Sequence, residues 1–283
     1  MYRLGEPAAQ LRLFIENYWF VSHAPGEEVE LRVDVYVDAR ADLVFNLEAP
    51  YRRVVVGGDT AEIAGSTLDA QRLVPIRIEQ RGLVTIVGVR FRLGGLAPFA
   101  RASLDRWSGL TPSPAEVFGA AVAVLERELG DSPDQERSTA LLDAFFLGLL
   151  HVGEAERALE RALAALVDSG GRASLADLAA AAAVSERQVQ RMFASRLGFP
   201  PRTVARVIRF QDALRRLMVD PGVSLGDVAS AAGYYDQAHF VREFREFTGG
   251  VPRGYRGYYP PEGPADFAPN VVAYIQDGET PPR

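Results

Sequence analysis

The chain has 283 residues, of which 48% are hydrophobic and 24% are charged, with a formal net charge of −6. These values are typical of a soluble globular protein that is long enough for two domains. The sequence contains no cysteine, which excludes disulfide bonds, thiolate metal sites and a cysteine nucleophile.

The start of the chain, MYRLGEPAAQLRLFIENYWF, has no basic flank leading into an apolar core, so we expect no signal peptide. The longest apolar stretches, such as Leu141 to Leu150, are too short or too interrupted to span a bilayer. We therefore predict a cytoplasmic protein with no membrane partner.

The first ninety residues are predicted to be rich in strands. Residues 8 to 20 have the pattern of a short amphipathic helix that runs into a strand. The spacing of apolar residues then changes to every second position. In LRVDVYVD, Leu31, Val33 and Val35 alternate with polar or aromatic neighbours, as in a half-buried strand. Similar runs continue to about Phe91. The connections are too short for helical crossovers, so we predict roughly six to eight mostly antiparallel strands.

Helices are predicted after the glycine pair at 94 and 95. Ser113-Pro114-Ala115-Glu116 is a helix start, with the helix expected to reach about Leu129. Ser132-Pro133-Asp134-Gln135 predicts a second helix through Leu150, and a third is expected from Glu154 to Val167. Gly170-Gly171 then marks a domain boundary, so the prediction is a β-rich domain with trailing helices at 1–170, a helical domain at 171–258 and a tail at 259–283. The fold class is α+β.

The helical domain contains the same pattern twice. Ser174, Leu175 and Asp177 recur as Ser224, Leu225 and Asp227, and each serine is positioned to cap a short helix. A turn follows in each copy, and a second cap comes directly after it, at Ser185 and at Asp236. Two short helices joined by a tight turn form a helix-turn-helix. A helix from about Pro201 to Met218 is predicted to join the two copies, and the second copy ends near Tyr255.

The second helix of each copy has a core face and an outward stripe. Val189 and Phe193 are predicted to face the core, which leaves long hydrogen-bonding side chains outside. Arginine can grip guanine, glutamine can grip adenine, and small apolar groups suit the thymine methyl. The predicted base-contacting residues are Arg187, Gln190 and Arg191 in the first copy, and Gln237, Ala238, Val241 and Arg242 in the second.

The charge distribution supports this interpretation. Residues 172–258 hold 13 arginines against 8 acidic residues, although the whole chain is acidic. A basic domain in an acidic protein indicates a polyanionic partner. The competing explanation is a solvated helix face, as most charged stripes are. The predicted phosphate-contacting residues are Ser185, Arg202, Arg206, Arg209 and His239.

The segments VSERQVQRMF, DQAHFVREFREFTG and VPRGYR resemble the paired helix-turn-helix module of the AraC family of bacterial transcription regulators. The resemblance covers about the last hundred residues, and it assigns base reading to the seven residues named above. Ala183 stands where a glycine is usual in the turn of the first copy. The resemblance implies double-stranded DNA as the partner, and it leaves open a small-molecule effector, a contact with RNA polymerase and a homodimer.

The front half, about residues 8 to 130, also resembles the uncharacterised domain that precedes this module in some AraC-type regulators. The shared motifs are ENYWF, DLVFNLE, VVGG and VGVRFRLGG, and they imply a sensory or assembly role. The candidates for an effector pocket are the aromatic residues Trp19, Tyr36, Phe45 and Phe91, with Asp42 and Asn46 to orient a polar ligand. Core packing is the competing explanation for aromatic residues in strands.

No catalytic pattern is recognisable. His23, His151 and His239 are far apart in sequence and fit no metal-binding or nucleophile-activating spacing, so we predict no metal site, no cofactor and no enzymatic activity. Two alternatives to DNA binding remain open: a module whose helix pairs dock a partner protein, and a small-molecule enzyme with a structural helical domain. In the tail, residues 271–276 are apolar enough to form a strand, and two outcomes stay open: it returns to the N-terminal sheet, or it is disordered without a partner.

Overall fold

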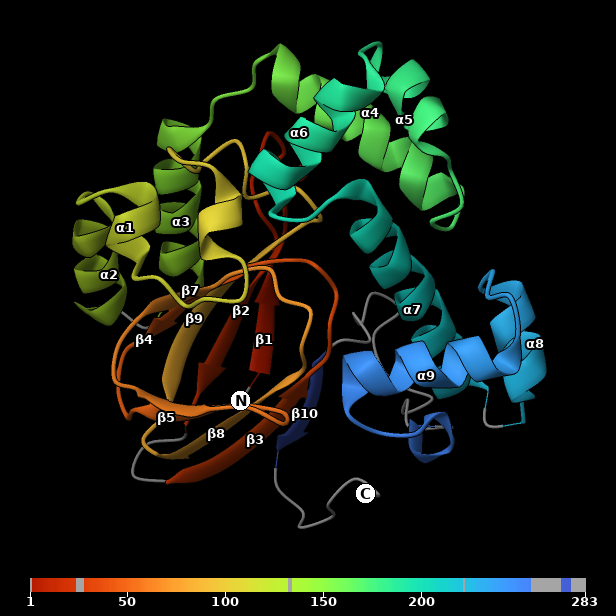
Figure 1. Cartoon of the computed structure of the whole chain (residues 1–283). Helices are drawn as coiled ribbons and strands as arrows, with labels where there is room; N and C mark the ends of the chain where they lie inside the picture. The colour runs from red at the N-terminus through yellow and green to blue at the C-terminus, as the bar shows by residue number, and fades with distance from the viewer. Residues whose placement is uncertain (1, 24–27, 132–133, 221, 256–270, 276–283) are drawn as a thin grey trace.

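The computed structural model describes residues 2–23, 28–131, 134–220, 222–255 and 271–275. It consists of a two-sheet β-structure with helices on one side, followed by the helical part of the chain (Figure 1). The predicted α+β fold, with β-strands first and paired helices last, is confirmed.

The strands form two five-stranded sheets in which every pairing is antiparallel. One sheet, called sheet A, has the order β1-β2-β9-β4-β7. Its strands are β1 (Tyr2–Gly5), β2 (Ile15–Ser22), β9 (Thr85–Phe91), β4 (Asp42–Asn46) and β7 (Thr67–Asp69). The other, sheet B, has the order β10-β3-β8-β5-β6. Its strands are β10 (Val271–Ile275), β3 (Val29–Val35), β8 (Ile76–Gly82), β5 (Tyr51–Val55) and β6 (Thr60–Ile63). Within the described chain, eight strands lie between residues 15 and 91, in agreement with the predicted number.

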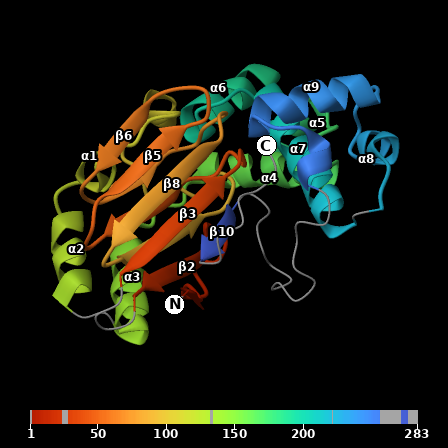
Figure 2. The same ribbon diagram turned by 90° about the horizontal axis from the view of Figure 1, so that it is seen from below.

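The two faces of sheet A have different neighbours. Leu43, Phe45 and Phe91 pack against the helices in the largest hydrophobic core, whereas the alternate residues face sheet B. Sheet B turns its other face to solvent, where Arg52 and Arg81 are exposed, and Figure 2 shows this sheet from its outer side. The N-terminal half is therefore layered as helices, sheet A and sheet B.

Three helices and a short 3-10 helix complete the N-terminal half: η1 (Leu104–Trp107), α1 (Pro114–Phe118), α2 (Val122–Asp131) and α3 (Gln135–Leu149). The single helix predicted from Pro114 to Leu129 is wrong, because Gly119 has φ 85° and ends α1 after five residues. The cap of α3 is Asp134 rather than Ser132, which lies outside the described residues. The Asp134 side chain accepts a hydrogen bond from the Arg137 N–H.

The helix predicted within residues 8 to 20 is also wrong. Short turns bring Leu11 and Ile15 into the core, but Leu13 remains 64% exposed. From Ile15 onward the chain pairs with β9, so tertiary pairing overrides the helical pattern.

The remaining helices are α4 (Glu154–Asp168), α5 (Leu175–Ala182), α6 (Glu186–Leu197), α7 (Pro201–Val219), α8 (Leu225–Ala231) and α9 (Gln237–Thr248), followed by η2 (Pro252–Tyr255). Figure 1 shows α4, α5 and α6 grouped above the sheets, with α7 leading away to α8 and α9. Buried α4 residues such as Leu159 share a core with Leu178 of α5 and Val189 of α6. The domain boundary after residue 170 stays a prediction, and α4, which precedes it, packs with the first helices that follow it.

Among the described residues, no single helix has the length and apolarity needed to cross a membrane, and α3 with α4 meets that test only as a pair bent by 115°. The tail strand β10 pairs antiparallel with β3 at the edge of sheet B.

Candidate nucleic-acid interface and buried cavity

The first helix-turn-helix consists of α5 and α6, and both helices begin with a capping box. The Ser174 Oγ accepts a hydrogen bond from the Asp177 N–H at 3.2 Å, and the Asp177 carboxylate accepts one from the Ser174 N–H at 2.8 Å. The side-chain and backbone hydrogen bonds from Ser174 lower the pKa of the Asp177 carboxyl. Ser185 and Gln188 repeat this arrangement at the start of α6. Between the helices Ala183 has φ 56°, so the turn is left-handed without a glycine.

The second helix-turn-helix consists of α8 and α9. Ser224 caps α8, and the Asp236 carboxylate caps α9 by accepting a hydrogen bond from the His239 N–H at 2.7 Å. The turn contains Gly233 with φ 79°. Its neighbour Tyr234 is buried, and its ring centroid lies 5.2 Å from that of Phe240.

The outward face of α6 carries the residues predicted to read bases. Val189 and Phe193 are fully buried, while Arg187, Gln190 and Arg191 are exposed. In the described part of the chain, neither Arg187 nor Arg191 forms an ion pair. The arrangement therefore holds the backbone of α6 by its inner face and leaves the long side chains available to a partner.

The outward face of α9 has the same organisation. Gln237, Ala238 and Arg242 are exposed, and they line a shallow surface groove with Val241 and Arg245. Val241 is half-buried against the core of the second copy, so it offers less surface than the sequence indicated. Arg245 was not predicted. Its position three residues after Arg242, one turn along the same face, is the signal that could have identified it.

The predicted phosphate contacts differ in their surroundings. Arg202 is exposed at the start of α7, and Arg209 donates a hydrogen bond from Nη1 to the Gly171 carbonyl oxygen at 2.8 Å. Both lie in a groove between α5, α6 and α7, together with Gln190 and with Arg172, which sequence reasoning missed. This groove brings positive charge beside the outward face of α6.

Three other predicted phosphate contacts already have partners inside the protein. Arg206 donates from Nε to Glu243 and from Nη2 to Glu246, both at 2.7 Å, and its guanidinium lies 5.1 Å from the centre of the Phe247 ring. Arg206 therefore joins α7 to α9, a role that the sequence did not reveal. Ser185 uses its hydroxyl for the cap of α6, and the ring of half-buried His239 packs edge-on against Tyr234 at 5.3 Å. Phosphate contact by these residues stays a prediction.

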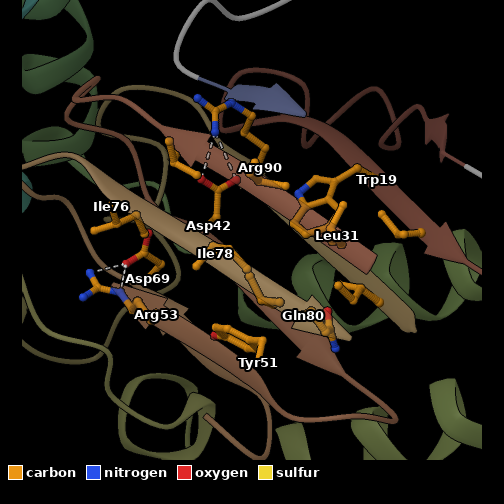
Figure 3. Close-up of a pocket in the computed structure, with 15 residues that line it drawn as sticks. Trp19, Leu31, Asp42, Tyr51, Arg53, Asp69, Ile76, Ile78, Gln80 and Arg90 are labelled. Carbon is orange, nitrogen blue, oxygen red and sulfur yellow. Dashed lines mark hydrogen bonds and ion pairs between the residues drawn. The ribbon is translucent and has the colours of Figure 1, made fainter. Parts of the chain in front are cut away.

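A mainly apolar cavity of about 150 Å³, partly open to the surface, lies between the inner faces of sheets A and B (Figure 3). Its walls are mainly aliphatic and aromatic; they comprise Trp19, Val21, Leu31, Val33, Val35, Val44, Tyr51, Ile76, Ile78 and Ile86. The polar lining residues are Asp42, Arg53, Asp69, Gln80 and Arg90. Burial raises the pKa of Tyr51 to about 12, against the weaker opposite effect of its hydrogen bond with Thr67.

Of the six predicted pocket residues, the structure brings only Trp19 and Asp42 to the cavity wall. Phe45 and Phe91 belong to the opposite face of sheet A, because side chains alternate along a strand, and they pack in the core against the helices. Tyr36 packs in the core of the second helix-turn-helix instead. Asn46 is buried and hydrogen-bonds to Gln80, which does line the cavity. The pocket assignment of Tyr36, Phe45 and Phe91 was therefore wrong.

Ion pairs close one end of the cavity. Arg90 donates to Asp42 at 2.8 Å and also pairs with Asp38, while Asp69 pairs with Arg53 at 2.9 Å and with Arg72 at 2.5 Å. Figure 3 shows the contacts from Arg90 to Asp42 and from Arg53 to Asp69. Burial raises the pKa of the Asp42 carboxyl, and the attraction of Arg90 opposes that rise.

Comparison with known proteins gives two family matches within the chain. Residues 178–258 match a helix-turn-helix domain, and residues 5–111 match a domain of unknown function (DUF6597). Transcriptional activator NphR from Rhodococcus sp. is 29% identical over 226 residues, which cover 78% of this chain and 61% of NphR. These matches support an AraC-type regulator. Both resemblances noted in the sequence are thereby supported, and the family consists of transcription regulators rather than enzymes.

Solved structures of two regulators show more distant likeness. ToxT from Vibrio cholerae is 10% identical, with a TM-score of 0.45 over 81% of this chain and 97% of that chain. The AraC-like transcriptional activator CuxR is 12% identical, with a TM-score of 0.27 over 68% of this chain and 79% of that chain. The family assignment does not rest on these two structures.

One loop of this chain connects the cavity to the second helix-turn-helix. Asp38, which pairs with Arg90, lies in the loop between β3 and β4. The same loop places Tyr36 against Tyr255 at 5.4 Å, and Tyr255 lies 5.1 Å from Phe244 of α9. In addition, Gln211 of α7 donates a hydrogen bond to the Val37 carbonyl oxygen. A continuous set of contacts thus runs from the cavity wall to the helix that carries Arg242.

Proposed function

We propose that this chain is a sequence-specific DNA-binding transcription regulator whose N-terminal half binds a small effector. The observation that carries the proposal is the pair of capped helix-turn-helix units. Each presents long hydrogen-bonding side chains on a helix whose other face is buried. In this arrangement α6 and α9 enter the major groove, and one chain contacts two successive turns of the duplex.

Side chains are assigned to two roles in the complex. Arg187, Gln190 and Arg191 read bases in one groove, and Gln237, Ala238, Val241 and Arg242 read the next, with Arg245 added at the end of that face. Arg202, Arg209 and Arg172 line the groove beside α6 and hold phosphates, which sets the register of the protein on DNA. Arg206, with its two carboxylate partners, holds α9 on α7 and makes a smaller contribution to the phosphate contacts.

The N-terminal half supplies regulation. Its cavity is apolar and large enough for a molecule about the size of benzene, and the loop from Tyr36 to Arg40 links the cavity wall to α7 and α9. An effector that binds one arrangement of this loop better than another would shift the orientation of the second helix-turn-helix. A cytoplasmic location, a contact with RNA polymerase and assembly as a homodimer are further parts of this proposal.

The test is a gel-shift titration of the full chain against labelled genomic fragments and scrambled DNA of equal length. We expect tight binding to a subset of fragments and a linear fall of log affinity with log salt, by about −0.9 for each phosphate contacted. Salt-dependent binding without preference for any fragment would contradict base reading. Absence of binding to all DNA would favour a module that docks a partner protein.

A further inference from the structure

The chemistry of the cavity wall restricts which effector the N-terminal half can accept. The carboxylates of Asp42 and Asp69, which line one end, are neutralised by arginines within hydrogen-bonding distance. Around them, Arg40, Arg53, Arg72 and Arg90 meet Glu16, Asp38, Asp42 and Asp69, so positive and negative groups are equal in number. A charged ligand would find no unneutralised partner there, and its burial in an apolar space would be costly.

The opposite end of the cavity has an unsatisfied hydrogen-bond acceptor. Gln80 is 3% exposed, and its Nε2 donates to the Ala49 carbonyl oxygen at 2.6 Å and to the Asn46 Oδ1 at 2.9 Å. A backbone carbonyl only accepts, so the amide nitrogen must face Ala49 and the orientation of the amide is fixed. The Gln80 Oε1 is left buried with no partner among the described groups. A buried acceptor without a donor is destabilising, and a bound donor would remove that cost.

The polar ends lie at opposite ends of β4. Asp42 begins this strand and Asn46, the partner of Gln80, ends it. The four steps along the strand from Asp42 to Asn46 span about 13 Å. Between the ends, the wall is formed by apolar side chains and by the indole of Trp19, which lies over Gly88. A Cβ at position 88 would overlap this ring, so the glycine allows the indole to lie against the β9 backbone.

From this geometry we propose that the cavity binds a neutral, compact and mostly apolar molecule that carries one hydrogen-bond donor, and that the donor binds the Gln80 Oε1. The size follows from the volume of about 150 Å³, because an engineered apolar cavity of that volume binds benzene. The proposal rests on the proposed effector-binding role and names the chemical class of the effector.

Four matched compounds test the class on the full chain by thermal unfolding and calorimetry. Cyclohexanol has the required shape and donor, methoxycyclohexane has the shape without the donor, and cyclohexanecarboxylate and cyclohexylammonium carry charges. We expect cyclohexanol to raise the unfolding temperature and to bind about fivefold more tightly than the ether, since one hydrogen bond contributes about 1 kcal/mol. The two ions should cause no shift.

Two substitutions locate the contact. Gln80→Met removes the acceptor at similar volume, so the affinity for cyclohexanol should fall to that for methoxycyclohexane, which should itself be unchanged. Gln71→Met is the matched control, because Gln71 is also buried with an unpartnered Oε1 but does not line the cavity. This variant should bind cyclohexanol as the original protein does.

Tighter binding of either ion would overturn the neutral class, and equal affinity for alcohol and ether in the original protein would overturn the donor contact. The ratio of the affinities for cyclohexanol and methoxycyclohexane in the original protein decides this point even if Gln80→Met fails to fold. Failure of all four compounds to bind would show that the cavity is a packing void. The gel-shift titration is independent of these results, so DNA binding with no ligand binding would reject this inference alone.

Discussion

The two helix-turn-helix copies are alike in sequence but are attached to the rest of the protein differently. Phe193 and Leu197 of α6 belong to the same hydrophobic core as Phe45 and Phe91 of sheet A. The core of the second copy contains Phe240 and Phe244. Its buried residues from the N-terminal half are Tyr36, Val37 and Ala39 of one loop, and half-buried Leu73 and Leu93 pack against it. The first copy is therefore part of the N-terminal body, whereas the second is carried on α7 and contacts the loop that leads from the cavity. In the proposed function, this difference makes the second copy the one whose position an effector would change.

The largest expected effect comes from emptying a core aromatic site in each copy. Phe193→Ala should lower the free energy of unfolding by about 3–5 kcal/mol, and it should loosen the strands of sheet A together with α5 and α6. Phe244→Ala should lower the free energy of unfolding by a similar amount, but it should loosen α8, α9 and the loop at Tyr36. Hydrogen exchange of both variants measures which backbone amides lose their protection. Unchanged exchange in sheet A of Phe193→Ala would show that the first copy is not part of that body.

A smaller effect is expected where the first copy docks onto η1. Gly198 has φ 72°, and a Cβ there would overlap the Ser108 Oγ, so Gly198→Ala adds a clash to the backbone strain. Gly57→Ala is the matched control, since Gly57 has φ 76° with open space around it. Gly57→Ala should lower the free energy of unfolding by about 1–2 kcal/mol.

In urea denaturation, Gly198→Ala should lower the free energy of unfolding by more than Gly57→Ala does. Adding Ser108→Gly to Gly198→Ala should restore the difference between the two. Equal costs at positions 198 and 57, with no recovery in the double variant, would mean that the contact with Ser108 does not hold the first copy in place.

The smallest predicted effect is a pH dependence of the first cap. The hydrogen bonds from Ser174 lower the pKa of Asp177 below its ordinary 3.8. A carboxyl with a depressed pKa in the folded state contributes stability above its unfolded pKa, and this contribution is lost as the pH falls through the folded value. Asp177→Asn should therefore remove part of the fall in stability below about pH 4. Parallel acid-unfolding curves for the two proteins would contradict the assigned role of this carboxylate.

The duplicated helices could be predicted because their signals are local. Caps at Ser174, Ser185 and Asp236 and the spacing of Val189 and Phe193 act within one or two turns of chain, and both helix pairs were found at nearly the predicted bounds. The start of the strand at Ile15 was misplaced because it depends on pairing with β9. The break at Gly119 was also missed, although the glycine itself is a local signal.

The cavity was less predictable for a related reason. The composition of β4 and β9 shows alternation but not which face meets the other sheet, so Phe45 and Phe91 were assigned to the wrong side. Gln80 and Arg90 gave no local signal, since their role depends on partners such as Ala49 and Asp38 in other segments. Likewise, only the packing of α7 on α9 reveals that Arg206 has Glu243 and Glu246 as partners.

The central claim is that α6 and α9 read bases, and the most direct test compares Arg191→Ala and Arg242→Ala with the original protein. Binding is titrated on a selected genomic fragment and on scrambled DNA at several salt concentrations, with Arg81→Ala on the outer face of sheet B as the control. Each test variant should lose about 1–3 kcal/mol on the selected fragment and relax its preference at one base position, while the control binds normally. If both variants stay folded and keep full discrimination between the two DNAs, then these arginines do not read bases and the account is wrong.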